Sequence, residues 1–158
     1  MFNSVLARIP ARGTVNVQAL RSLHQTHPKL SRFSDLVRKV EKEQGIHSIT
    51  VSQLHQQLSV TSPPHVIDVR ESSEISRGKI PRAIPLPRGI LERDVEKHIK
   101  AEDESKVVVY CAGGLRSILA AESLIRMGYK NVLSLEGGID AWRKEGYEIE
   151  AGEKQGDA

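Results

Sequence analysis

The fold of this chain is decided by residues 107–117, which read Val107-Val108-Val109-Tyr110-Cys111-Ala112-Gly113-Gly114-Leu115-Arg116-Ser117. A short apolar run without polar alternation predicts a strand over residues 106–110 that is covered on both faces. Apolar residues then recur with helical spacing over residues 117–127, and Gly128 stands where a helix ends. Cys111 should therefore lie at the carboxyl end of a buried strand, in a loop that leads into a helix.

This loop has the composition of an anion-binding turn. Gly113 and Gly114 permit backbone conformations in which successive N–H groups point inward, and the start of a helix adds a positive dipole end. A lone cysteine is more often a small buried apolar residue. A core position needs neither two glycines nor the cation of Arg116 directly after it. The sequence therefore predicts a reactive Cys111, present as the thiolate at neutral pH.

Strand and helix patterns alternate along the rest of the chain. Strands are expected at residues 46–49, 65–70 and 131–135, and helices at 34–44, 50–58, 91–99 and from 139 onward. Ser34 is a candidate N-cap, Gly45 a candidate C-terminal glycine, and Thr50 with Gln53 matches a capping box. Residues 71–92 are rich in turn residues. This order predicts an α/β domain with a mostly parallel central sheet and helices on both faces, with its site at the carboxyl ends of the strands.

Composition narrows the function classes. The length of 158 residues suits one domain with a core and an extension, and no apolar run is long enough to span a bilayer. The single cysteine excludes an internal disulfide framework, and the six histidines show no metal-ligand spacing. We expect no metal, no cofactor and no membrane association.

The positive charge of the chain is concentrated at its N-terminus. Residues 1–34 hold five basic and no acidic residues, which leaves 18 basic against 20 acidic residues in the remainder. We therefore expect no nucleic-acid partner. Residues 1–33, rich in Arg, Ser and scattered apolar residues, have the composition of a mitochondrial transit peptide, which predicts a location in the mitochondrial matrix. The alternative is a basic tail on a cytoplasmic protein. The segment 34–45 would be a linking helix, 46–150 the domain and 151–158 a polar tail.

Four motifs resemble, in order, the signatures of single-domain rhodaneses. They are Val66-Ile67-Asp68-Val69-Arg70-Glu71, Gly78-Lys79-Ile80-Pro81-Arg82-Ala83-Ile84-Pro85-Leu86-Pro87, Cys111-Ala112-Gly113-Gly114-Leu115-Arg116-Ser117 and Leu135-Glu136-Gly137-Gly138-Ile139-Asp140-Ala141-Trp142. The resemblance covers residues 46–150. It implies a rhodanese-like three-layer domain and a thiosulfate sulfurtransferase, in which a loop cysteine carries sulfane sulfur as a persulfide.

The resemblance also implies roles for individual residues. Cys111 would be the nucleophile, and Arg116 would hold the anionic donor and stabilise the departing sulfite. The backbone amides of the loop would cradle the donor and then the terminal sulfur; they belong to Ala112, Gly113, Gly114, Leu115, Arg116 and Ser117. The partners would be a small anionic sulfur donor such as thiosulfate or a persulfide, and a thiol, cyanide or protein-thiol acceptor.

Two further features are interpreted as mainly structural, and a third as a surface charge. Asp68 and Arg70, at a strand end, would order neighbouring loops through charge-assisted hydrogen bonds and act as supporting residues. Gly137, Gly138 and Trp142 would be turn and core residues. Lys79 and Arg82 stand where rhodanese-like sequences often have His and Gly. As surface residues, they would add positive charge near the pocket.

Three alternatives remain open from the sequence. A cysteine phosphatase or arsenate reductase also uses a thiolate in a helix-capped loop, but the four residues between Cys111 and Arg116 are one fewer than is typical of cysteine phosphatases. A non-catalytic rhodanese-like module would bind a protein partner, yet such modules commonly lack the cysteine. A redox sensor would need glutathione or a partner thiol, because the chain has no second cysteine.

Overall fold

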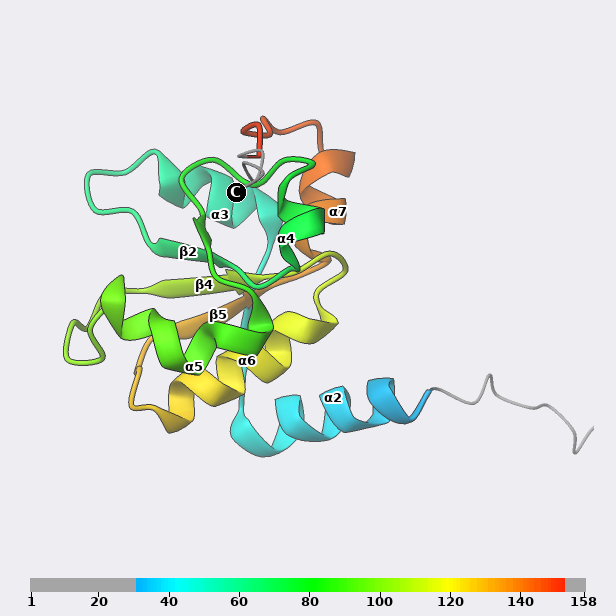
Figure 1. The fold of residues 1–158 in the computed structure, drawn as a ribbon, viewed down its shortest axis with the longest axis vertical. Coiled ribbons are helices and arrows are strands. Elements are labelled where there is room, and N and C mark those ends of the chain that lie inside the picture. Colours follow the sequence, from blue (N-terminus) through cyan, green and yellow to red (C-terminus); the bar gives the residue numbers. More distant parts are fainter. Residues whose placement is uncertain (1–30, 153–158) are drawn as a thin grey trace, which may run out of the picture. The chain divides into compact units, whose positions relative to one another are not determined.

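The structure, a computed structural model, describes residues 31–152 and has a five-stranded parallel sheet at its centre (Figure 1). The strand order is β1-β5-β4-β2-β3. The strands are β1 (His47–Ile49), β2 (His65–Asp68), β3 (Ile84–Pro85), β4 (Val107–Tyr110) and β5 (Val132–Leu135). Each paired register is parallel. The α/β architecture expected from the alternating patterns is confirmed.

Helices cover both faces of the sheet. Helices α2 (Arg32–Gln44), α5 (Leu91–Asp94) and α6 (Leu115–Arg126) pack on one face, and α3 (Val51–Leu58) and α7 (Gly138–Lys144) on the other (Figure 1). Successive residues at the end of β4 and just after it alternate between the hydrophobic clusters on the two faces of the sheet. Val109 and Cys111 belong to the cluster that includes α6 residues, whereas Val108 and Tyr110 belong to the cluster that includes α7 residues. All four β4 residues are buried, which explains why this strand has no polar alternation.

Helix caps follow the sequence with one exception. Thr50 and Gln53 form the predicted capping box, and Gly45 ends α2 in the left-handed conformation with φ of 59°. The predicted N-cap Ser34 is wrong. Ser31 caps α2 by accepting a hydrogen bond from the Ser34 N–H at 3.2 Å. The helix therefore begins at Arg32, inside the segment that the sequence assigned to the basic extension; residues 1–30 lie outside the described residues.

Several element boundaries differ from expectation. The strand predicted over 65–70 ends at Asp68, because the Arg70 N–H bonds the Asp68 side chain instead of a neighbouring strand. The helix predicted over 91–99 is the short α5 followed by a 3₁₀ turn, η3 (Val95–Lys97). The turn-rich region contains α4 (Ser72–Ile75), β3 and a second 3₁₀ turn, η2 (Arg88–Ile90). Pro85 is tolerated in β3 because this strand lies at the sheet edge.

Within residues 31–152, no helix combines the length and the apolar character needed to cross a membrane.

Candidate active site

The loop between β4 and α6 holds the cysteine as the sequence predicts. Gly114 precedes α6 with φ of 91°, a left-handed conformation that favours glycine, and its N–H donates to Cys111 Sγ at 3.2 Å. Cys111 is only 1% exposed, whereas Gly113 and Leu115 are exposed at the rim of the loop. The sulfur is thus held at the base of the loop by a backbone donor at a helix N-terminus. Backbone N–H groups at a helix N-terminus also form a site that can bind an anion.

Two serines support the loop from behind. Ser117 Oγ lies 3.8 Å from Cys111 Sγ and donates to the Gly114 carbonyl at 2.9 Å. Ser134 Oγ on β5 donates to Ser117 Oγ at 2.9 Å. Both serines are buried, so each hydroxyl is satisfied within the protein. Ser117 was expected in the loop, but Ser134 was not. Its only signal is a serine inside the otherwise apolar run of β5.

The glycine turn before α7 holds the other side of the loop. The Ile139 N–H donates to the Cys111 carbonyl at 2.9 Å, and the Asp140 N–H donates to the Ala112 carbonyl at 3.1 Å. Gly138 approaches so closely that a Cβ atom there would lie 2.3 Å from the Cys111 carbonyl oxygen. Gly138, predicted as a turn residue, therefore helps to fix the position of the loop. Trp142, predicted as a core residue, is buried at 1% exposure.

Arg116 forms an ion pair that the sequence did not reveal. Its two terminal nitrogens donate to the Glu74 carboxylate at 2.7 and 2.8 Å, and both side chains are partly buried. Hydrogen bonds from Arg116 lower the pKa of Glu74 from 4.5 to about 2. The pKa of Arg116 is raised, mainly by Glu74 and to a smaller degree by the Cys111 side chain. The guanidinium thus lies within electrostatic reach of the sulfur, with its plane fixed by a bidentate partner.

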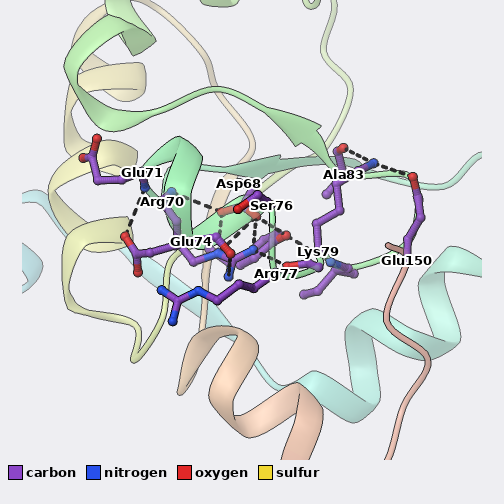
Figure 2. Close-up of polar contacts among 12 residues, drawn as sticks. Asp68, Arg70, Glu71, Glu74, Ser76, Arg77, Lys79, Ala83 and Glu150 are labelled. Atoms are coloured by element: carbon purple, nitrogen blue, oxygen red, sulfur yellow. Dashed lines mark hydrogen bonds and ion pairs between the residues drawn. The ribbon is translucent and has the colours of Figure 1, made fainter. Parts of the chain in front are cut away.

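Asp68 and Arg70 form a buried pair beside this site (Figure 2). Arg70 Nη2 donates to the Asp68 carboxylate at 2.6 Å and to the Gly78 carbonyl at 2.8 Å, and Nη1 donates to the Glu74 carbonyl at 3.2 Å. Tyr110 Oη also donates to Asp68, at 2.6 Å. Arg70 therefore connects the end of β2 to α4, which carries Glu74. These contacts are of the kind expected from the sequence, and none reaches Cys111 itself.

Comparison with known proteins decides the family. A model of the rhodanese-like domain matches residues 50–145. The chain belongs to the rhodanese-like domain family. A sulfurtransferase from Allochromatium vinosum is 37% identical over 108 residues, which are 68% of this chain and 98% of that protein. The thiosulfate sulfurtransferase GlpE from Coxiella burnetii is 35% identical over 78 residues, covering 49% of this chain and 70% of the relative. These relatives identify the rhodanese-like chain as a member of a sulfurtransferase family.

A solved structure from Rhodopseudomonas palustris is similar over most of this rhodanese-like chain. It has a TM-score of 0.65 and 34% identity, and the match covers 75% of this chain and 93% of that one. Its description as a protein of unknown function and possible tyrosine phosphatase belongs to that protein. A rhodanese-related protein from Thermoplasma volcanium is also similar, with a TM-score of 0.57 and 34% identity, over 66% of this chain and 98% of that one. This likeness confirms the rhodanese-like domain expected from the sequence.

Two departures from rhodanese-like sequences receive a physical explanation. Lys79 is not a surface residue: it is 9% exposed, pairs with Glu150 at 2.7 Å and donates to the Ala83 carbonyl at 3.1 Å (Figure 2). The prediction that Lys79 is exposed beside the pocket is therefore wrong. Arg82 is exposed, but its φ of 65° is the left-handed conformation that favours glycine. This conformation explains why rhodanese-like sequences often have Gly there.

No group of three or more His, Cys, Asp or Glu side chains within residues 31–152 is arranged to hold a metal ion.

Proposed function

We propose that this protein transfers sulfane sulfur from thiosulfate or a persulfide to a thiol or cyanide through a persulfide on Cys111. The observation that carries the proposal is the hydrogen bond from the Gly114 N–H to Cys111 Sγ at the start of a 12-residue helix. Arg116, the second residue of this helix, adds a guanidinium two residues after Gly114. In the proposed reaction Cys111 would attack as the thiolate, which needs no general base because it attacks sulfur directly.

In the first half-reaction, Cys111 Sγ attacks the outer sulfur of thiosulfate. A new bond joins the two sulfurs, and the S–S bond of the donor breaks with its electron pair leaving on sulfite. Arg116 would orient the sulfonate with the guanidinium N–H groups that Glu74 does not use. Because Arg116 is paired with the opposite charge of Glu74, we infer that Arg116 acts through the direction of its N–H groups more than through net charge.

In the second half-reaction, the acceptor attacks the outer sulfur of the Cys111 persulfide. The bond between that sulfur and Sγ breaks, and its electron pair returns to Cys111 as the thiolate. The loop amides of residues 112–117 would stabilise the negative charge on the outer sulfur in the intermediate state. The relative GlpE, named a thiosulfate sulfurtransferase, supports thiosulfate as the donor.

Phosphatase chemistry is the second candidate, because the similar Rhodopseudomonas palustris protein is described as a possible tyrosine phosphatase. One feature of the present site argues against it. Only four residues separate Cys111 from Arg116, one fewer than is typical of cysteine phosphatases, which makes a small loop. Turnover of p-nitrophenyl phosphate that exceeds thiosulfate turnover would favour the phosphatase. A non-catalytic binding module would show neither activity.

Intact-mass measurement after thiosulfate treatment tests the proposed function. We expect the protein to gain about 32 Da, the mass of one sulfur atom, and the Cys111→Ser variant to gain nothing. Addition of cyanide should then remove the adduct and release thiocyanate. A reactive Cys111 thiol that gains no sulfur would contradict the proposal.

A further inference from the structure

Two serine hydroxyls connect the neighbouring strand β5 to the sulfur of Cys111. Ser134 on β5 donates to Ser117 Oγ at 2.9 Å, and Ser117 Oγ donates to the Gly114 carbonyl at 2.9 Å. Cys111 Sγ lies 3.8 Å from the same Ser117 oxygen. Because β5 is adjacent to β4 in the sheet, Ser134 reaches the start of α6 from a distant part of the sequence (Figure 1).

These three side chains are closed off from solvent. Cys111 is 1% exposed, Ser117 0% and Ser134 2%. Burial of a hydroxyl costs free energy unless the hydroxyl is hydrogen-bonded, so a serine inside an apolar strand needs a partner. Ser134 finds that partner in the serine that faces the cysteine. Hydrogen bonds in such a site are stronger than in water, and linked bonds polarise one another.

The protons of the two serines are all in use. A hydroxyl has one proton to donate and two lone pairs with which it accepts. Ser134 gives its proton to Ser117, and Ser117 gives its own to the Gly114 carbonyl. Ser117 therefore presents a lone pair to Cys111, which suits a protonated thiol that donates weakly. A negatively charged Sγ in the same place would need a donor instead.

In the proposed reaction, Sγ carries this charge before it attacks the donor and again when the persulfide bond breaks. Rotation of the Ser117 hydroxyl would turn its proton from the Gly114 carbonyl to Sγ while the oxygen stays in place. The Gly114 carbonyl would keep a partner, because the carbonyl of an N-cap residue accepts the first hydrogen bond of its helix. The bond from Ser134 would also persist, and by polarising the Ser117 hydroxyl it would strengthen the donation to sulfur.

We propose that Ser134 is a positioning residue for sulfur transfer and acts on Cys111 through Ser117. This inference rests on the proposed function. Ser134 holds the Ser117 oxygen and strengthens Ser117 as a donor whenever Sγ is charged. No covalent bond to hydrogen is exchanged between the serines and the sulfur: the Ser117 hydroxyl only rotates, and the thiol proton of Cys111 has left to solvent.

Single-turnover formation of the persulfide, followed by intact mass at increasing thiosulfate concentrations, tests this role in the full-length protein. Ser134→Ala should lower the rate at saturating thiosulfate about five- to tenfold, the effect of one hydrogen bond that matters in the transition state. The thiosulfate concentration that gives half of this rate should not change, because Ser134 acts on the sulfur of Cys111 and not on the bound donor.

Ser123→Ala is the matched control. Ser123 is another buried serine, 8% exposed on α6, and its hydroxyl accepts a hydrogen bond from Arg88 at 2.8 Å. Its replacement removes the same group from the same helix face of the sheet without changing the contacts of Ser117. This variant should therefore form the persulfide at the parent rate.

A pair of substitutions of nearly equal shape separates the hydroxyl from packing. Ser134→Thr keeps a hydroxyl and should stay close to the parent rate, whereas Ser134→Val lacks it and should be as slow as Ser134→Ala. Because Ser134 acts through Ser117, the double variant Ser117→Ala/Ser134→Ala should be no slower than Ser117→Ala alone.

A parent rate in Ser134→Ala, equal rates in the Thr and Val variants, or additive losses in the double variant would overturn the role of Ser134. If the larger side chains prevent folding, Ser134→Ala, its Ser123→Ala control and the double variant still decide. Failure of the proposed function looks different: the parent protein itself would gain no sulfur from thiosulfate, and the role of Ser134 in sulfur transfer would be refuted with it.

Discussion

Replacement of Gly138 by Ala should disable the cysteine loop without touching Cys111. The added Cβ would lie 2.3 Å from the Cys111 carbonyl oxygen and 2.4 Å from the Ala112 carbonyl oxygen. Carbon–oxygen contacts are ordinarily about 3.3–3.6 Å, so the loop must move by about 1 Å. A misplacement of this size at a reacting group costs about 100-fold in rate. We therefore expect persulfide formation from thiosulfate to slow about 100-fold.

The same substitution should also reduce stability. Gly138 has φ of 55°, and the left-handed conformation costs an alanine about 1–2 kcal/mol. Weakening of the two loop hydrogen bonds from Ile139 and Asp140 adds about 0.5–1.5 kcal/mol each. The free energy of unfolding should therefore fall by about 2–5 kcal/mol, of which only the first part is backbone strain.

Gly45→Ala is the matched control. Gly45 has nearly the same φ, 59°, but a Cβ there would meet nothing within 4 Å. It should lose about 1–2 kcal/mol of stability through the backbone alone and keep the parent rate. Intact-mass time courses with thiosulfate give the rate, and urea unfolding gives the stability. A folded Gly138→Ala protein that gains sulfur at the parent rate would refute the assignment of Gly138 as a loop-positioning residue.

Three further predictions concern charge, burial and targeting. Glu74→Gln should lower the free energy of unfolding by about 1–2 kcal/mol at pH 7, allowing for partial exposure of the pair with Arg116. Since the pKa of Glu74 is lowered to about 2, its stabilisation is complete above about pH 4.5. The stability gap between parent and variant should therefore close as the pH falls from 4.5 toward 2; a gap that persists in urea unfolding at pH 2 would contradict this. Tyr110→Phe should lower the free energy of unfolding by about 3 kcal/mol, because it removes a hydrogen bond to the buried Asp68 carboxylate and leaves the Ile80 N–H unpaired. Tyr129→Phe removes a single hydrogen bond to the Ile99 carbonyl and should lower it by about 1 kcal/mol. Equal losses in the two tyrosine variants would show that the bond to Asp68 contributes little. Residues 1–33 fused to a fluorescent protein should direct it to mitochondria, and a cytosolic fusion would exclude a transit peptide.

The parts of the fold that depend on local patterns were predictable from the sequence. The buried strand before Cys111, the glycine turn and the helix after it are neighbours in the chain, so their order alone places the thiol. Thr50 with Gln53 formed the expected capping box for the same reason. The short elements between residues 71 and 92 were not predicted, because a two-residue strand and a four-residue helix are too short to show a periodic pattern of apolar residues.

The missed contacts join residues that are distant in the chain. Glu74 and Arg116 are 42 positions apart, and Ser134 is 17 positions from Ser117. With 20 acidic residues available, nothing in the sequence selects Glu74 as the partner of Arg116. Lys79 shows the same problem, because its ion pair with Glu150 depends on the isolated antiparallel bridge between these two residues. Such partners are chosen by the sheet order, which local patterns do not specify.

For the proposed sulfur transfer, the long-range contacts would also limit how sulfur leaves the site. Three elements outside the loop restrain it. Backbone amides of α7 donate hydrogen bonds to its carbonyls, Ser134 on β5 donates to Ser117, and Glu74 on α4 forms an ion pair with Arg116. In the proposed reaction, a loop restrained from three sides would not carry a Cys111 persulfide outward to a distant acceptor. Because Cys111 is the only cysteine in the sequence, no second thiol of the chain can collect the sulfur internally. In the proposed reaction, an acceptor would therefore have to come to the loop from outside, where Gly113 and Leu115 are the exposed loop residues.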